Sequence, residues 1–269
     1  MRWPGKKSKY KNHIIPHLPT SYSTYIEPFL GSGALFLHIA PSKWIVNDIN
    51  MDVINIWQNV LKTPRILISL YSALQRTFLA SNVDVKSLGH EHTNMIPKMK
   101  YTAKRAALYT FMSHISYTSH IVRNNRFYFP GFSKSIKLDN LYLLSEPYAN
   151  NMYAVSNHLQ KSDGQIMNSD FQVVLRLAKR NDFVFLDPPY MEDHNYQLNY
   201  NIGETLDESF MDRLLKELKK LDRKGVKWLM TQADTTQVRV AFNDYIVARF
   251  PVFRGLSQTP KYELIIKNY

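Results

Sequence analysis

The residue run with the clearest chemical potential in this sequence is Asp187-Pro188-Pro189-Tyr190, which directly follows the apolar run VFL at 184–186. A short apolar run of this kind predicts a buried strand, and the prolines end that strand because proline cannot continue a sheet. Asp187 is therefore expected at the carboxyl end of a strand, where open α/β sheets bind their ligands. The alternative is an ordinary Pro-Pro turn that leaves an aspartate in solvent.

A second candidate site lies in EPFLGSGALF, where Phe29, Gly31 and Gly33 follow an apolar stretch. Glycines between a strand and a helix let a ligand approach the backbone closely. Phe36 stands where a dinucleotide fingerprint would place its third glycine, which weakens the case for NAD. Asp48 ends the next expected strand, at the position from which a carboxylate binds ribose hydroxyls. The pattern suits a cofactor with a nucleoside but no pyrophosphate, although two glycines often form only a turn.

An α/β core must position these residues. Strand, helix, strand and helix follow one another over 24–62, which predicts a doubly wound, mostly parallel sheet. The strand pattern returns near 164–171, and helical periodicity dominates at 65–80, before a polar linker at 81–97. We therefore expect an inserted, mainly helical region between two halves of the sheet.

This organisation predicts two domains. Residues 1–60 and 166–269 form the first, which carries the candidate chemistry, and residues 61–165 form the insert.

The composition points to a nucleic-acid partner. The chain carries a net charge of +12, and an excess of this kind favours a polyanion, nucleic acid before membrane. The alternative is a basic, solvated surface. The absence of cysteine excludes a disulfide framework and thiolate chemistry. Because no apolar run is long enough to span a membrane and the N-terminus has no signal peptide pattern, we expect a soluble, intracellular protein.

The insert concentrates basic and aromatic side chains, and it has no acidic residue from His92 to Leu138. Acid-free basic stretches neutralise phosphates, and arginines can read bases. IVRNNRFYFP at 121–130 looks like a hairpin, with an Asn-Asn turn. The alternative is an aromatic core with a solvated basic face. The residues expected to contact nucleic acid are Lys98, Lys100, Lys104, Arg105, Arg123, Asn124, Asn125, Arg126, Lys134 and Lys137.

Motif by motif, the chain resembles the Dam-like DNA adenine-N6 methyltransferases, which use S-adenosylmethionine. The resemblance rests on six segments that follow the family's order over most of the chain. They are RWPGKK at 2–7, EPFLGSGALF at 27–36, NDIN at 47–50, SDF at 169–171, DPPY at 187–190 and MTQADT at 230–235. In the last segment, Thr231-Gln232 replaces the family's Ser-Asn pair.

The resemblance implies a Rossmann-like methyltransferase fold and a role for each motif. Asp187 and the Pro188 carbonyl would accept hydrogen bonds from the adenine amino group and stabilise the positive charge that develops on it. Tyr190 would stack on the adenine after it is flipped out of the duplex. Asp187, Pro188, Pro189 and Tyr190 are thus the expected catalytic residues, and no metal is required. The expected cofactor-binding residues are Trp3 and Lys7 at the methionine end, Phe29, Gly31 and Gly33 in the loop, Asp48 at the ribose, Asp170 and Phe171 at the adenine, and Asp187.

Several alternatives remain open at this stage. The same machinery would serve an RNA adenine or the N4 of cytosine, although an initial Asp in the motif is associated more with adenine. A nucleic-acid-binding homologue without catalysis is a third possibility. His120 and Val122 depart from the family's recognition pattern, so the family's usual GATC target is not implied. The expected partner is double-stranded DNA, and the sequence leaves open a cognate restriction enzyme and the oligomeric state.

Overall fold

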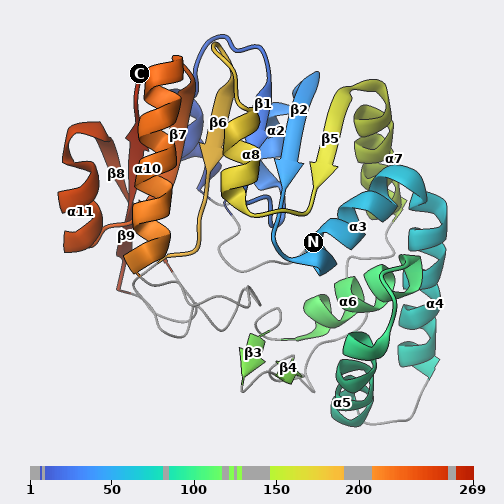
Figure 1. Ribbon diagram of the computed structural model, residues 1–269. Coiled ribbons are helices and arrows are strands. Elements are labelled where there is room, and N and C mark those ends of the chain that lie inside the picture. The colour runs from blue at the N-terminus through green and yellow to red at the C-terminus, as the bar shows by residue number, and fades with distance from the viewer. Residues whose placement is uncertain are drawn as a thin grey trace. The chain divides into compact units, whose positions relative to one another are not determined.

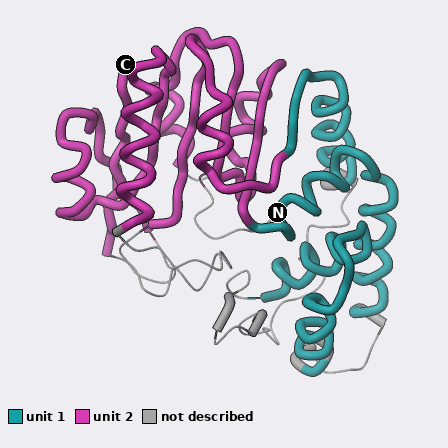
Figure 2. Tube along the Cα trace, viewed as in Figure 1, with its two compact units in different colours: residues 1–6, 50–166, 198–201 teal, residues 7–49, 167–197, 202–269 magenta. Residues whose placement is uncertain are grey.

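The chain divides into two compact units, which are coloured separately in Figure 2. The computed structural model describes residues 7, 10–80, 85–116, 121–123, 126–128, 146–190, 208–253 and 259–269. Unit 1 comprises residues 1–6, 50–166 and 198–201, and unit 2 comprises residues 7–49, 167–197 and 202–269.

The helix α3, Met51–Lys62, belongs to unit 1, whereas we expected residues up to 60 to group with the sheet. Hydrogen bonds to other helices of unit 1 hold it there. The Asn55 amide donates to the Thr102 carbonyl at 3.0 Å, and the Gln160 amide donates to the Leu61 carbonyl at 2.8 Å. The function of each unit stays a prediction.

A seven-stranded mixed sheet confirms the expected doubly wound α/β core, and its order is β5-β2-β1-β6-β7-β9-β8. β1 pairs in parallel with β2 and β6, and β6 pairs in parallel with β7, whereas β9 is antiparallel to β7 and β8. The strands are β1 Tyr25–Glu27, β2 Lys43–Asn47, β5 Asp163–Met167, β6 Phe183–Leu186, β7 Lys227–Ala233, β8 Ile246–Val252 and β9 Lys261–Lys267.

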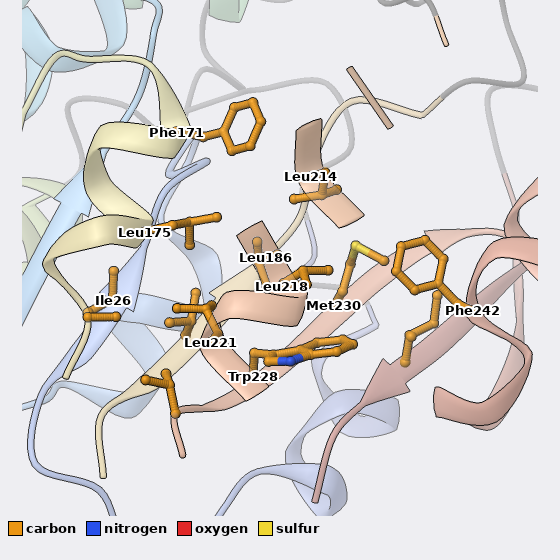
Figure 3. Packing of buried hydrophobic residues seen from close by; sticks show 14 of the residues in the cluster. Ile26, Phe171, Leu175, Leu186, Leu214, Leu218, Leu221, Trp228, Met230 and Phe242 are labelled. Carbon is orange, nitrogen blue, oxygen red and sulfur yellow. The ribbon is translucent and has the colours of Figure 1, made fainter. Parts of the chain in front are cut away.

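One face of the sheet is covered by α8, Phe171–Leu177, and α10, Glu208–Lys224 (Figure 1). Because side chains alternate along a strand, every second residue faces these helices. A hydrophobic core fills the space between them (Figure 3), and each large side chain in it contributes about 1.5–3 kcal/mol when fully buried. Its members include Ile26, Val184, Leu186, Trp228, Met230, Leu264 and Ile266 from the sheet and Leu175, Leu214, Leu218 and Leu221 from the helices.

The intervening strand residues point to the other face, beside α2, Ala34–Ile39. There the Phe36 ring lies 6.0 Å from Tyr25 and 5.1 Å from Trp44, centroid to centroid. The alternation matters for function, because it assigns Glu27 on β1, Thr231 on β7 and Glu263 on β9 to this second face.

Short helices complete unit 2. They are α1 Lys11–Ile14, η2 Ile15–His17, α11 Thr236–Phe242 and η6 Asn243–Tyr245. Among the residues that the structure describes, no helix combines the length and the apolar character needed to cross a membrane.

Unit 1 is mainly helical, as expected for the insert, and it carries the expected hairpin, whose antiparallel strands place Arg123 opposite Arg126. The polar linker predicted at 81–97 is wrong, because residues 85–95 form a helix. Thr93 on that helix is buried, and His92 lies 5.7 Å from Phe78, centroid to centroid. The elements are α4 Pro64–Ala80, α5 Val85–Met95, η3 Ile96–Lys98, α6 Ala103–Ile115, β3 Ile121–Arg123, β4 Arg126–Tyr128 and α7 Glu146–Lys161.

Candidate active site

The carboxyl ends of neighbouring parallel strands bring the candidate residues of unit 2 to one edge of the sheet. Asp48 comes one residue after β2 and Asp187 one residue after β6, as the sequence predicts. β6 and β7 pair in the register Leu186↔Met230. Continuing that register by one residue sets Asp187 beside Thr231. Asp187 is thus positioned by the strand pairing itself.

Three donors converge on one oxygen of Asp187. The Lys7 ammonium lies 2.8 Å from Oδ1, the Thr231 hydroxyl donates to Oδ1 at 3.0 Å, and the Tyr190 hydroxyl donates to it at 3.3 Å. Lys7 also donates to the Tyr190 hydroxyl at 2.7 Å and lies 3.6 Å from Glu263 Oε2. These residues form a connected polar cluster at the strand ends.

The cluster is buried, and Asp187 is its most accessible member. The side chain of Asp187 keeps 20% of its surface exposed, whereas Lys7 keeps 5%, Tyr190 4%, Glu263 4% and Thr231 none. Buried charges are normally paired in proteins because desolvation is costly. The Lys7 ammonium supplies that pairing for the two carboxylates.

Burial and neighbouring charges tune the groups of this cluster. Burial raises the pKa of the Asp187 carboxyl, Glu263 adds to the rise, and the Lys7 charge and the Thr231 hydroxyl oppose it. Burial also raises the pKa of Tyr190 well above its ordinary value, so its hydroxyl stays a neutral donor. Asp187 is therefore a more basic hydrogen-bond acceptor than an exposed aspartate.

Glu27 at the end of β1 is a further buried carboxyl, and the Tyr25 hydroxyl donates to its Oε2 at 2.6 Å. Burial raises the pKa of Glu27 well above its ordinary value, against the effect of the Tyr25 hydrogen bond, and the charges of Asp187 and Asp48 add to the rise. Glu27 therefore holds its proton to a higher pH than an exposed glutamate.

The glycine-rich turn is fastened to Asp48. Gly31 and Gly33 have φ of 46° and 60°, a left-handed conformation that residues with a Cβ rarely adopt. The Gly31 amide donates to Asp48 Oδ2 at 2.8 Å, and the Leu30 amide donates to the Asn47 carbonyl at 2.8 Å. Asp48 therefore shapes the turn in addition to the ribose-binding role expected of it.

Asparagine side chains tie this turn to the loop before α8. The Asn47 amide group donates to the Pro28 carbonyl at 2.9 Å and to the Ser169 carbonyl at 3.0 Å. The Asn168 amide group donates to the Asp48 carbonyl at 2.8 Å. Two of the predicted cofactor segments, NDIN and SDF, are thus joined by direct hydrogen bonds.

At the start of α8, Asp170 caps the helix by accepting from the Gln172 amide at 2.8 Å, and it pairs with Arg213 at 3.1 Å. The Phe171 ring packs 5.5 Å from Phe29, centroid to centroid, and the Arg213 guanidinium lies 5.2 Å from the Phe171 centroid. The structure thus brings Phe29, Asp170 and Phe171 together, and it adds Arg213 to the group.

Sequence reasoning missed the part played by Thr231, Glu263 and Arg213. A usable signal existed for Glu263, because it is a charged residue within the otherwise apolar run YELII. Trp3 lies outside the described residues. Within the part of the chain that is described, no group of three or more His, Asp or Glu side chains is arranged to hold a metal ion.

The buried position of Arg105 argues against the expected contact of this residue with nucleic acid. Arg105 is buried, and its guanidinium forms a two-point pair with Asp52, at 2.6 Å from Oδ1 and 2.9 Å from Oδ2. It also donates to the Ile96 and Met99 carbonyls, both at 2.7 Å. Asp52 is itself 3% exposed, so it requires a charged partner in the interior.

Three lysines in and between η3 and α6 are exposed and remain candidates for phosphate contacts. They are Lys98, Lys100 and Lys104. Six further predictions lie outside the described residues or side chains. Arg123 and Arg126 have a described backbone only, and Asn124, Asn125, Lys134 and Lys137 are not described.

Comparison with known proteins gives one family and several relatives. The model of the D12 class N6 adenine-specific DNA methyltransferases matches residues 3–254. The Type II methyltransferase M1.LlaDCHI of Lactococcus lactis subsp. cremoris is 27% identical over 280 residues, covering 100% of this chain and 94% of its own length. The DNA adenine methylase of Haemophilus influenzae is 22% identical over 277 residues, and the match covers 100% of this chain and 91% of the length of that protein. The DNA N-6-adenine-methyltransferase of Escherichia phage P1 is 25% identical, covering 97% of this chain and 33% of its own length.

Proposed function

Because the chain belongs to the D12 class of N6 adenine-specific DNA methyltransferases, we propose that the polar cluster around Asp187 is the site at which it methylates adenine. The enzyme transfers a methyl group to the exocyclic N6 amino group of adenine in DNA. The family match favours DNA over RNA and adenine N6 over cytosine N4. The observation that carries the assignment of the site is Asp187 at the carboxyl end of β6, held by three donors and still partly exposed.

Asp187 would activate the amino group. An adenine amino nitrogen is a poor nucleophile because its lone pair is delocalised into the ring. The Asp187 carboxylate and the Pro188 carbonyl would each accept a hydrogen bond from the adenine amino group. Both acceptors would stabilise the positive charge that develops on the nitrogen. After it gains the methyl group, the nitrogen carries one proton too many, and the Asp187 carboxylate, whose pKa burial raises, would take that proton.

The methyl donor of the family is S-adenosylmethionine, which when bound supplies a methyl group activated by a sulfonium. The residues of the glycine turn fit such a cofactor, because Asp48 already fixes the Gly31 amide and thereby the path of the turn. Gly31, Gly33 and Asp48 would hold the nucleoside, and Phe29 and Phe171 would offer aromatic surface for its base. Lys7 would lie toward the methionine end.

The substrate would be double-stranded DNA, from which the target adenine is flipped out. Flipping costs a few kcal/mol, and Tyr190 would stack on the displaced base. Lys98, Lys100 and Lys104 in unit 1 would contact phosphates.

The assignment is tested with Asp187→Ala. We expect methyl transfer from tritiated S-adenosylmethionine to unmethylated duplex DNA to be abolished, while binding of the cofactor and of DNA changes little. Single-stranded DNA and RNA serve as competing substrates in the same assay. Turnover of the variant near the wild-type rate would place the amino-activating acceptor elsewhere.

A further inference from the structure

The carboxylate of Asp187 is held asymmetrically. All three donors reach Oδ1, from Lys7 at 2.8 Å, Thr231 at 3.0 Å and Tyr190 at 3.3 Å. Between the residues that the structure describes, no hydrogen bond reaches Oδ2. Oδ1 therefore accepts all the hydrogen bonds found here, and the Asp187 side chain keeps 20% of its surface exposed.

Of these donors, Thr231 is the one built into the sheet. It lies on β7, its side chain is fully buried, and the β6–β7 register sets it beside Asp187. Threonine is stiff about χ1 because its Cβ is branched, whereas lysine reaches its partner through four rotatable bonds. A short donor on a central strand can therefore fix the rotation of the carboxyl group more tightly than Lys7 can.

We propose that Thr231 is a positioning residue for catalysis: its hydroxyl fixes Asp187 through Oδ1, so that Oδ2 is directed to the adenine amino group. This inference rests on the proposed role of Asp187. It gives a function to the threonine that stands where the resembling family has a serine, which retains a hydroxyl at the same place.

The geometry has a consequence for a matched pair of variants. Thr231→Val replaces the hydroxyl by a methyl group of nearly the same size, so packing is conserved while the donor is lost. Thr231→Ser conserves the donor and loses the methyl group. A packing role predicts that serine is the worse replacement, and a positioning role predicts that valine is.

We expect Thr231→Val to lower kcat by roughly tenfold to a hundredfold, the range for a lost hydrogen bond to a charged group, and Thr231→Ser to recover most of the rate. The Kd for S-adenosylhomocysteine and for duplex DNA should stay within about twofold of wild type. Thr110→Val is the control, because the Thr110 hydroxyl is buried in unit 1 without a hydrogen-bond partner in the described structure. Its kcat should not change.

The Asp187 titration gives a readout independent of turnover. The charged and titratable groups that face this carboxyl are Lys7, Glu263 on β9, Tyr190 and Glu27 on β1. Since the Thr231 hydroxyl stabilises the ionised form, Thr231→Val should move the Asp187 carboxyl titration, followed by ¹³C NMR, to higher pH. The acidic limb of kcat should move in the same direction, and Thr231→Ser should leave both near wild type.

The inference is overturned if Thr231→Val keeps kcat within about twofold of wild type, or if serine is no better than valine. Thermal unfolding checks that each variant is folded, and Thr231→Ala replaces the valine variant in the comparison with serine if valine prevents folding. Asp187→Ala distinguishes a failure of the proposed active site from a failure of the proposed role of Thr231. If that variant stays active, the proposed site is wrong, and if it is inactive while Thr231→Val is normal, only the role of Thr231 is wrong.

Discussion

The buried pair of Arg105 and Asp52 gives the sharpest test of how unit 1 is built. Arg105→Met keeps a long apolar side chain but removes four hydrogen bonds, two to the Asp52 carboxylate and two to backbone carbonyls. It leaves Asp52, which is 3% exposed, without its partner. Breaking a buried pair in this way costs about 3–5 kcal/mol, a large share of a typical stability of about 5–15 kcal/mol.

For a chain of this size, such a loss lowers the midpoint of thermal unfolding by roughly 6–20 °C. The measurement is calorimetry or far-UV circular dichroism of Arg105→Met, Asp52→Leu and the double variant. The double variant removes both charges, so its loss of stability should be smaller than the sum of the two single losses. This coupling would show that the two side chains stabilise the fold as a pair.

A comparison of Arg105→Met with Lys104→Ala decides whether Arg105 has any part in DNA binding. Lys104 is its exposed neighbour, so Lys104→Ala should lower the affinity for duplex DNA and reduce the slope of log K against log salt by about one. Arg105→Met, measured well below its unfolding temperature, should leave that slope unchanged. A normal unfolding temperature together with a reduced slope in Arg105→Met would refute this reasoning.

Three further predictions concern the candidate site and the hairpin. Asp48→Ala should weaken binding of S-adenosylmethionine by roughly 1.5–3 kcal/mol. Asp48→Asn should weaken it by less, because the amide oxygen of asparagine can still accept from the Gly31 amide. Equal losses of affinity in calorimetry would show that the hydrogen bond to the glycine turn does not contribute to cofactor binding. Burial raises the pKa of Asp187, and its ionised form is the proposed acceptor, so kcat should fall as the pH drops through a value above the pKa of an ordinary aspartate. A pH–rate profile that is flat down to about pH 4 would contradict this. Arg123 and Arg126 pair across the hairpin, so at least one of Arg123→Ala and Arg126→Ala should change which sites are methylated. The measurement is sequencing of the methylated sites in a random-sequence library. An unchanged site preference in both variants would place recognition elsewhere.

The sequence by itself determined the local features of the site. The apolar run before Asp187 specified a strand and the prolines specified its end, so the position of Asp187 followed without coordinates. Gly31 and Gly33 similarly indicated a turn that the structure shows with positive φ. Such features are decided by neighbouring residues, because backbone preferences and side-chain periodicity are short-range properties.

Only the tertiary structure decided which side chains meet. Arg105 looked like a phosphate ligand because its own segment contains no acid, yet its partner Asp52 lies 53 residues away. Thr231 and Lys7 contact Asp187 across 44 and 180 residues of sequence, and the pairing of β6 with β7 brings Thr231 there. The residue type gives the charge and the hydrogen-bond donors of a side chain, but its partner depends on long-range packing, which no local pattern encodes.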